Sequence, residues 1–402
     1  MKRILFLSFC RYDTLNIQDF YADILRQFTG NGDYVCVVSL EEKKRNIPTH
    51  IKHEDNCSIL HVKIGNYFNV NAMNKGLTLI QLEHKVLMAI KRYFKEVKFD
   101  LVLYATPPIS FARVIRYIKN RDNAESYLML KDIFPQNAID LGMMSKTGLS
   151  SFIYKYFRYK EKELYNTSDR IGCMSQANCD YLLRHNNYIN SNKVEICPNC
   201  IEPQDIICDN KQKITIRKKY DIPVDKKVFI YGGNLGKPQD IPFIIECIKK
   251  LRQQSEAFFL IVGDGTEYNK LKVFFDNEKP LNAKLLKKLP KTDYNLLVAA
   301  CDIGMIFLDH RFTIPNFPSR LLSYMQAELP VLACTDSNSD IGKIIVDGRF
   351  GWWCESSDTD TFLATVNIAV NDNLTSMGEN AKHFLIENYT AKHGAEIILR
   401  QR

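Results

Sequence analysis

The sequence lacks the motifs of several common enzyme classes. No G-x-G-x-x-G pattern follows the first apolar run, where the chain instead reads Ser8-Phe9-Cys10-Arg11-Tyr12-Asp13, so ordinary NAD binding is disfavoured. No P-loop, G-x-S-x-G or H-E-x-x-H motif is present. Walker-type phosphoryl transfer, serine hydrolysis and zincin chemistry therefore lack their residues.

Long hydrophobic runs are also missing. No stretch approaches the ~18 consecutive apolar residues of a membrane-spanning helix, and the run Ile4–Cys10 is too short for a signal peptide. The 12 cysteines are scattered. Cys197-Pro-Asn-Cys200 has the spacing of half a zinc or redox site, but no second C-x-x-C or histidine pair accompanies it. We therefore expect a cytoplasmic chain with reduced thiols and no metal or other cofactor.

What is present is an ordinary globular composition. The chain has 402 residues, of which 46% are hydrophobic and 25% charged, which is enough apolar material for substantial cores. A prior of ~150 residues per domain predicts two to three domains, and two is the count that we carry forward.

Short β-rich runs alternate with helical patterns along nearly the whole length, which indicates doubly wound α/β architecture. The expected strands are Ile4–Phe9, Tyr34–Ser39, Ile59–Ile64, Leu101–Ala105, Tyr127–Leu130, Arg170–Cys173, Lys193–Cys197, Lys227–Tyr231, Phe258–Val262, Lys284–Leu286, Ile303–Leu308 and Val331–Ala333. The expected helices are Ile17–Phe28, Leu77–Lys95, Ile109–Lys119, Leu149–Tyr165, Ser175–Arg184, Ile241–Arg252, Glu267–Asp276, Asp293–Ala300, Ser319–Ala327 and Ser339–Val346.

The alternation fades after Pro198-Asn199 in a polar stretch and restarts after about Pro223. We therefore expect two Rossmann-like domains, 1–200 and 201–388, facing across a cleft. A C-terminal helix over 389–402 would pack back on the first domain. In open α/β sheets, ligands bind outside the carboxyl ends of the strands.

Positive charge is concentrated in the first half, where residues 1–200 hold 28 basic and 20 acidic residues, against 26 of each in the second half. The segment 152–165 combines six aromatic with four basic residues, and a second helical pattern carries Lys85, Lys91, Arg92, Lys95 and Lys98. This composition suits docking on an anionic membrane surface. A core-facing helix with a solvated, charged outer side would use the same residue types.

Three turns in the second half follow expected strands. They are Tyr231-Gly-Gly-Asn-Leu-Gly-Lys237, Val262-Gly-Asp-Gly265, and the segment from Ile314 that opens a helix at Pro318-Ser319-Arg320. Glycines let the backbone approach a phosphate closely, and helix N-termini attract anions. The plainer alternatives are turn shape and an ordinary capped helix start.

These segments, together with Pro198-Asn199, resemble the nucleotide-sugar half of retaining glycosyltransferases of family four, which have the GT-B fold. In the first half, Lys131-Asp-Ile-Phe-Pro135 is similar to the R-D-x-W-P segment of the N-acetylfucosamine-transferase-like branch, which builds bacterial capsule and O-antigen repeat units. Tyr104-Ala-Thr-Pro-Pro-Ile109 resembles that branch too.

The sequence departs from the family pattern at several positions. Where the family has two glutamates spaced by seven residues, this chain has Pro315 and Ser323, and the small-residue helix is followed by Glu328 and Pro330 rather than Gly-x-Pro. The family's diphosphate-neutralising Arg and Lys correspond to Asn234 and Gln239. Lys237 and Arg320 are the remaining cations.

The resemblance implies a donor site formed by the three turns, with the nucleotide base beside Leu289-Pro290. Its expected members are Gly232, Gly233, Asn234, Lys237, Gln239, Gly263, Asp264, Leu289, Asn316, Phe317, Pro318, Ser319, Arg320 and Ser323. On the acceptor side we expect Arg11 and Asp132, with Asp132 as the catalytic carboxylate. An aspartate that merely caps a turn before proline is the alternative for Asp132.

The expected activity is retaining transfer of a sugar, N-acetylated by the resemblance, from a UDP-sugar to a lipid-diphosphate-linked acceptor in capsule or O-antigen synthesis. The protein would sit peripherally on the inner face of the cell membrane and would not bind nucleic acid. Two alternatives stay open. One is a non-hydrolysing UDP-sugar epimerase, which the eight scattered histidines disfavour; the other is an inactive nucleotide-sugar-binding protein, which the absent glutamates permit.

Overall fold

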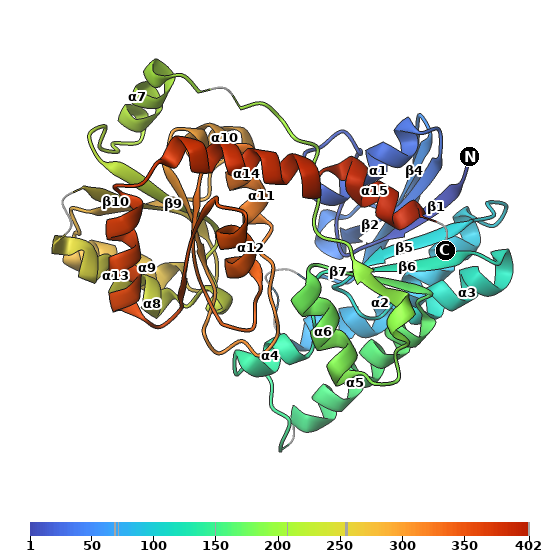
Figure 1. Ribbon diagram of the computed structural model, residues 1–402. Coiled ribbons are helices and arrows are strands. Elements are labelled where there is room, and N and C mark those ends of the chain that lie inside the picture. Colours follow the sequence, from blue (N-terminus) through green and yellow to red (C-terminus); the bar gives the residue numbers. More distant parts are fainter. Residues whose placement is uncertain (68–69, 71, 149, 207, 254–255, 401–402) are drawn as a thin grey trace. The chain divides into compact units, whose positions relative to one another are not determined.

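The computed structural model describes residues 1–67, 70, 72–148, 150–206, 208–253 and 256–400. The chain folds into two compact units (Figure 1). Unit 1 contains residues 1–202 and the segment that begins at Ala391, and unit 2 contains Pro203–Thr390. The expected boundaries were 200 and 388. Leu149, the first residue of one expected helix, and 401–402, the end of the expected C-terminal helix, lie outside the described residues.

Unit 1 is built on an eight-stranded sheet of order β3-β4-β2-β1-β5-β6-β7-β8. All of its pairings are parallel except that of β3 with β4. The strands are β1 (Arg3–Leu7), β2 (Tyr34–Glu42), β3 (His50–Glu54), β4 (Cys57–Ile64), β5 (Leu101–Ala105), β6 (Glu125–Leu130), β7 (Arg170–Cys173) and β8 (Val194–Ile196). Every residue of β5 and β7 is buried, as expected for a sheet covered on both faces.

Helices connect these strands. They are α1 (Phe20–Gly30), α2 (Ala72–Tyr93), α3 (Ala112–Asp122), α4 (Gln136–Asp140), α5 (Ser150–Thr167), α6 (Gln176–His185) and α15 (Ala391–Leu399), with the short 3₁₀ turns η1 (Lys43–Arg45) and η2 (Ser191–Lys193). Asp19 caps α1 by accepting hydrogen bonds from the amides of Tyr21 and Ala22. The last helix, α15, packs on α1 and shares its apolar core.

Unit 2 has a six-stranded, wholly parallel sheet of order β11-β10-β9-β12-β13-β14. Its strands are β9 (Lys227–Asn234), β10 (Ala257–Asp264), β11 (Ala283–Lys287), β12 (Ile303–Phe307), β13 (Val331–Thr335) and β14 (Gly351–Glu355). Its helices are α7 (Asn210–Lys219), α8 (Ile241–Lys250), α9 (Tyr268–Glu278), α10 (Lys291–Ala299), α11 (Arg320–Gln326), α12 (Ile341–Asp347), α13 (Thr359–Ala369) and α14 (Leu374–Asn388), with η3 (Lys237–Gln239) and η4 (Leu251–Gln253).

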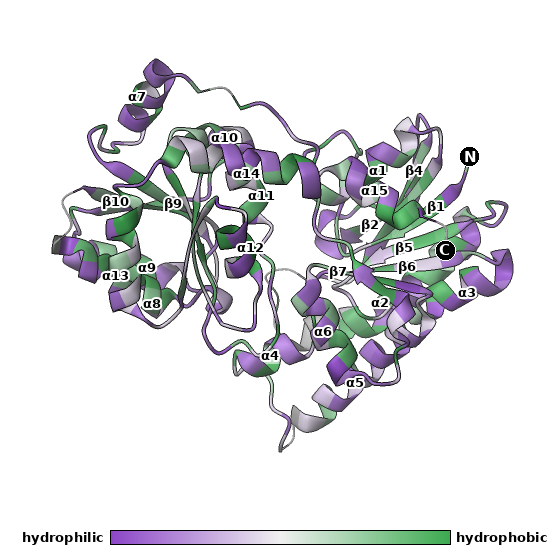
Figure 2. Cartoon of the chain, viewed as in Figure 1, coloured by the Kyte–Doolittle hydropathy of each residue, from purple (hydrophilic) through white to green (hydrophobic). Residues whose placement is uncertain are grey.

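The polar stretch before Pro223 contains a helix that its fading periodicity did not predict. Figure 2 shows α7 as largely hydrophilic, and Arg217 is its buried residue. Its start is fixed by a capping box between Asp209 and Gln212 instead of by an apolar stripe. The edge strands β3 and β14 were also not predicted, since half-exposed edge strands carry a weak hydrophobic signal.

Candidate active site

The glycine-bearing ends of β9 and β10 lie side by side at the carboxyl edge of the unit 2 sheet. Gly233 pairs in register with Gly263, and Asn234 with Asp264. A Cβ atom on Gly263 would lie 2.0 Å from the carbonyl oxygen of Gly233, and Gly233 itself has φ +135°. Both positions therefore require glycine, and they leave bare backbone at this edge.

Arg320, the first residue of α11, extends toward this bare backbone. Its guanidinium carbon lies 4.3 Å from the centroid of the Tyr231 ring and 3.5 Å from where a Cβ of Gly233 would be. Its Nη1 atom is buried and has no hydrogen-bond partner among the residues that the structure describes. A cation held on an aromatic face with an unused donor is well suited to receive an anionic oxygen at the Gly233 turn.

Tyr324 supports the same turn from one helical turn further along α11. Its hydroxyl donates to the carbonyl of Met305 at 3.1 Å and accepts from the amide of Gly232 at 3.2 Å. Burial raises the pKa of Tyr324 to about 12, so the hydroxyl keeps its proton near neutral pH. The β9 turn is thereby tied to the helix that carries Arg320.

The two residues that replace the family's cations bind each other. The side-chain oxygen of Gln239 accepts from Asn234 Nδ2 and from the amide of Gly236, both at 3.1 Å. Gln239 is buried, so this amide pair shapes the turn. Lys237 is exposed, and it forms no ion pair with any residue that the structure describes. Asp264 accepts a hydrogen bond from the amide of Gly265 and so closes the second turn.

The loop before α11 is held by a buried carboxylate that sequence reasoning missed. The amide of Asn316 donates to Ser339 Oγ at 2.9 Å, and that hydroxyl donates to Asp336 Oδ2 at 3.0 Å. Asp336 also accepts from the amides of Asn338 and Ser339. Burial raises its pKa to about 6. The sequence did offer one signal for Asp336, because an aspartate directly follows the apolar run of β13.

The remaining expected donor residues differ in their surroundings. Phe317 is buried with its ring centroid 5.9 Å from that of Tyr389, so it anchors the loop in the core. Ser319 is exposed and makes no side-chain capping bond to α11. Pro318 and Ser323 are half-buried. Leu289, also half-buried, follows β11 at the same carboxyl edge of the sheet.

In unit 1, Asp132 follows β6 at the carboxyl edge of that sheet. Thr106, which follows the neighbouring strand β5, accepts hydrogen bonds from the amides of Lys131 and Asp132 at 3.0 and 3.3 Å. The side chain of Asp132 is exposed, yet desolvation by the surrounding protein raises its pKa to about 6. A carboxyl group with this pKa can accept or hold a proton near neutral pH.

Arg11 follows β1 at the same edge, but its guanidinium is already paired. It donates to Glu41 at 2.9 Å and to Asp13 at 2.7 Å. Glu41 is fully buried and lies 3.1 Å from His61 Nδ1. Arg11 therefore neutralises the buried carboxylate of Glu41. An acceptor would have to displace this carboxylate before it could bind the Arg11 guanidinium directly.

Two groups of side chains in the described part of the chain could hold a metal ion. They are Asp13 with Glu41 and His61, and Asp240 with Asp309 and His310. In each group an arginine, Arg11 or Arg311, already pairs with a carboxylate. Cys197 and Cys200 are buried free thiols and belong to neither group.

Comparison with known proteins indicates the enzyme class of this chain. Residues 212–384 match the family described as "Glycosyl transferases group 1". A "Probable glycosyltransferase WbjE" from Pseudomonas aeruginosa is 23% identical over 323 residues, which cover 79% of this chain and 77% of the relative. The chain is a glycosyltransferase.

A further relative agrees with this assignment, and a solved structure shares the fold. The glycosyltransferase is 24% identical over 213 residues to "UDP-Gal:alpha-D-GlcNAc-diphosphoundecaprenol alpha-1,3-galactosyltransferase" of Escherichia coli, covering 50% of this chain and 52% of that protein. The crystal structure of Anabaena Alr3699/HepE in complex with UDP superposes with a TM-score of 0.68 and 14% identity over 98% of each chain. The expected GT-B fold, with two Rossmann-like sheets, is confirmed.

No helix among the residues that the structure describes is long and apolar enough to span a bilayer.

Proposed function

We propose that this glycosyltransferase moves a hexosyl group, N-acetylated in the natural donor, from a UDP-sugar to a lipid-diphosphate-linked saccharide, with retention at the anomeric carbon. Two relatives support the substrate classes. The galactosyltransferase named above takes UDP-Gal and a diphosphoundecaprenol-linked sugar by its name, and the HepE structure contains UDP. The N-acetylfucosamine-transferase-like branch rests on the Lys131–Pro135 segment and remains a prediction.

The observation that carries the proposal is the buried guanidinium of Arg320 beside Gly233. When a sugar leaves a nucleoside diphosphate, negative charge develops on the departing phosphate oxygen. The unused Nη1 donor of Arg320 would stabilise that oxygen without prior reorganisation, because Tyr231 and the α11 backbone already fix the side chain. Retention then needs no enzyme nucleophile, since the departing oxygen can take the acceptor proton on the same face of the sugar.

Asp132 is proposed to act on the acceptor. Its backbone is fixed by Thr106 at the carboxyl end of the unit 1 sheet, and its side chain is accessible. The carboxylate can accept a hydrogen bond from the acceptor hydroxyl and orient it for attack.

The proposal includes peripheral docking on anionic membrane through unit 1. Helix α5 exposes a stripe of large side chains at Phe152, Tyr156 and Tyr159, and Ile153 is exposed beside it. The spacing of four and three residues puts the stripe on one face of the helix. Its basic residues are only partly available, because Arg158 pairs with Glu161, and Lys160 pairs with Glu83 and Glu163. Docking would therefore rely more on aromatic insertion than the composition alone indicated.

Release of UDP is the readout that separates this proposal from its alternatives. Purified protein is incubated with UDP-N-acetylhexosamines, with and without a membrane extract that supplies lipid-linked saccharides. Acceptor-dependent UDP release with a radiolabelled lipid product supports the transferase. Conversion of the donor sugar to its epimer would instead indicate the epimerase. Tight UDP binding without turnover would favour the inactive nucleotide-sugar-binding protein. That alternative stays open because this chain has Pro315 and Ser323 where the family has its two glutamates.

A further inference from the structure

Unit 1 contains a cavity of about 540 Å³ at the carboxyl ends of β2 and β4. It is lined by Lys43, Lys63, Ile64, Gly65, Asn66, Leu77, Thr78, Gln81 and Lys85, and we call it the lysine pocket. The volume falls in the range of small-ligand sites, ~300–1,000 Å³. Lys43 directly follows β2, and Asn66 lies just beyond the end of β4. This is the edge at which open α/β sheets bind their ligands.

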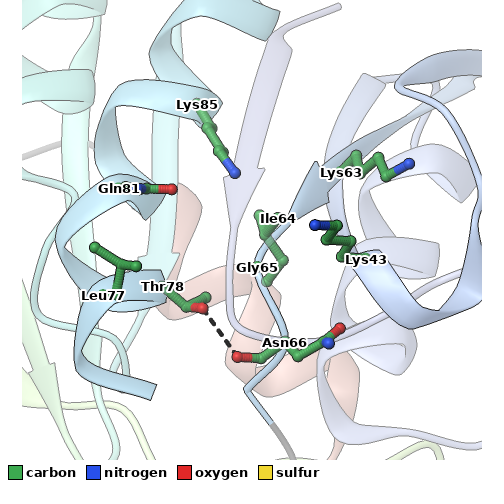
Figure 3. A pocket seen from close by; sticks show the side chains of 9 residues that line it. All are labelled: Lys43, Lys63, Ile64, Gly65, Asn66, Leu77, Thr78, Gln81 and Lys85. Atoms are coloured by element: carbon green, nitrogen blue, oxygen red, sulfur yellow. Dashed lines mark hydrogen bonds between the residues drawn. The ribbon is translucent and has the colours of Figure 1, made fainter. Parts of the chain in front are cut away.

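The wall of the pocket is fixed by specific contacts (Figure 3). Thr78 Oγ1 donates to the carbonyl of Asn66 at 2.9 Å, and Asn66 Oδ1 accepts from the amide of Lys44 at 2.8 Å. A Cβ atom on Gly65 would lie 2.2 Å from Thr78 Oγ1, so only glycine lets α2 approach this loop so closely. The pocket is a built feature of the fold, since these contacts join η1, the segment after β4 and α2 in its wall.

Its positive charge is not compensated by neighbouring side chains. Within the described ranges, none of Lys43, Lys63 and Lys85 forms an ion pair, whereas the adjacent Lys44 pairs with Glu42 at 2.9 Å. Figure 3 shows the amines of Lys43 and Lys85 turned toward each other across Ile64 and Gly65. Like charges around one cavity repel each other unless an anion lies between them.

Exposed apolar side chains lie at the pocket and next to it on α2. Leu77 lines the pocket and is exposed, and Ile80, three residues further along α2 and outside the lining, has 65% of its surface exposed. A ligand that satisfies both features has an anionic head with several oxygens and a hydrocarbon chain beside it. The two facing amines of Lys43 and Lys85 exceed what one monoanionic group needs, which favours a diphosphate head, while the amine of Lys63 points away from them and adds only to the surrounding positive charge.

We propose that the lysine pocket binds the diphosphate group of an amphiphilic ligand. The preference for a lipid-linked diphosphate over a free one rests on the proposed function, because a lipid-diphosphate-linked saccharide is the acceptor in that proposed reaction. The strand order fits this reading. β2 and β6, which precede Lys43 and Asp132 respectively, are three strand spacings apart, or about 14 Å. A saccharide attached to the held diphosphate would extend along the sheet edge toward Asp132.

The test is equilibrium binding with any nucleotide site filled. Isothermal titration calorimetry in saturating UDP is run with inorganic pyrophosphate and with geranyl diphosphate as the two probes. Wild-type protein is expected to bind at least one of them, with affinity that falls as salt rises. The double variant Lys43→Gln/Lys85→Gln should bind at least tenfold more weakly. The control Lys211→Gln/Lys218→Gln removes the same charge from exposed positions of α7 in unit 2 and should stay within twofold.

The two probes separate the possible sources of the ligand. Tighter binding of geranyl diphosphate that Leu77→Ser/Ile80→Ser abolishes assigns a lipid-linked diphosphate, whereas equal affinity for both probes assigns a free phosphoanion. No binding of either probe, or wild-type affinity in Lys43→Gln/Lys85→Gln, overturns the proposal. If the double variant melts earlier than wild type, the single change Lys43→Gln at its exposed position is measured instead. None of these readouts requires sugar transfer, so the pocket and the proposed activity can fail independently.

Discussion

Arg320 rests one face of its guanidinium on Tyr231, and its buried Nη1 has no hydrogen-bond partner within the described part of the chain. If this donor meets the diphosphate of UDP, Arg320→Ala removes a charge-assisted hydrogen bond. We expect UDP affinity measured by calorimetry to weaken by about 1.5–3 kcal/mol. Arg252→Ala, which loses an exposed pair with Glu278, serves as the control and should bind UDP normally. Unchanged affinity in Arg320→Ala removes that residue from the site.

Asp132 has a pKa of about 6 because desolvation disfavours its charged form. If its carboxylate orients or deprotonates the acceptor, kcat/KM should rise with pH through about 6 and then level off. Asp132→Asn should lose this rise and cut turnover by ~10²–10⁴ while UDP affinity stays near the wild-type value. Turnover within a few-fold of wild type would show that Asp132 only caps the turn before Pro135.

Asp336 makes stability depend on pH with a definite sign. Burial raises its pKa from 3.8 to about 6, so the folded state holds this proton more tightly than the unfolded chain. The stabilisation is complete below pH ~4 and is lost as pH rises through 6, by up to about 3 kcal/mol. Urea unfolding of wild type and Asp336→Asn across pH 4 to 7 measures this. Parallel pH profiles for the two proteins would contradict it.

Among the elements, the paired glycine-bearing ends of β9 and β10 tolerate little change. A methyl group on Gly263 would meet the Gly233 carbonyl at 2.0 Å, which forces backbone to move. Gly263→Ala should destabilise unit 2 by about 1–3 kcal/mol, the range for overpacking, and weaken UDP binding. Gly30→Ala is the matched control, because nothing lies within 4 Å of its Cβ position at the end of α1. A stable Gly263→Ala protein with normal UDP affinity would mean that the turns can separate.

How far the sequence predicts these elements depends on how strongly each one is buried. The continuous apolar runs of β1, β5 and β10 indicated strands correctly, because parallel strands covered on both faces need such runs. The edge strand β3 and the polar helix α7 carry too little apolar pattern to be recognised. The confirmed two-sheet fold follows from the alternation alone.

The site was less predictable than the fold. Sequence pattern pointed to Arg320, but nothing in it showed that Asn234 and Gln239 would bind each other or that Arg11 would be paired with Glu41. Which side chains meet across a sheet depends on how neighbouring strands align, and the sequence pattern does not give that alignment. Tyr324 was within reach of prediction, since it lies four residues after Arg320 on the same helix face.

At the scale of the whole molecule, the exposed α5 stripe predicts binding to anionic vesicles. Each basic residue near such a surface contributes about 1 kcal/mol, and aromatic side chains add apolar burial. Phe152→Ser/Tyr159→Ser should lower co-sedimentation severalfold, because these side chains are 70% and 62% exposed. Ile368→Ser, which changes an exposed apolar residue of unit 2, is the control. Equal binding to neutral and anionic vesicles, or none at low salt, would contradict the electrostatic part of this docking.

Because α15 returns to unit 1, that unit is formed by two separate segments of the chain. The backbone passes from unit 1 to unit 2 after Glu202 and comes back before Ala391, so no single cut yields two intact pieces. A fragment ending at 202 would expose the apolar face of α1 that Ala391, Ala395 and Ile398 cover. Unit 2 is in effect an insertion between two parts of unit 1, and its excision would leave an intact core in the first unit only if a short linker rejoined residues 202 and 391.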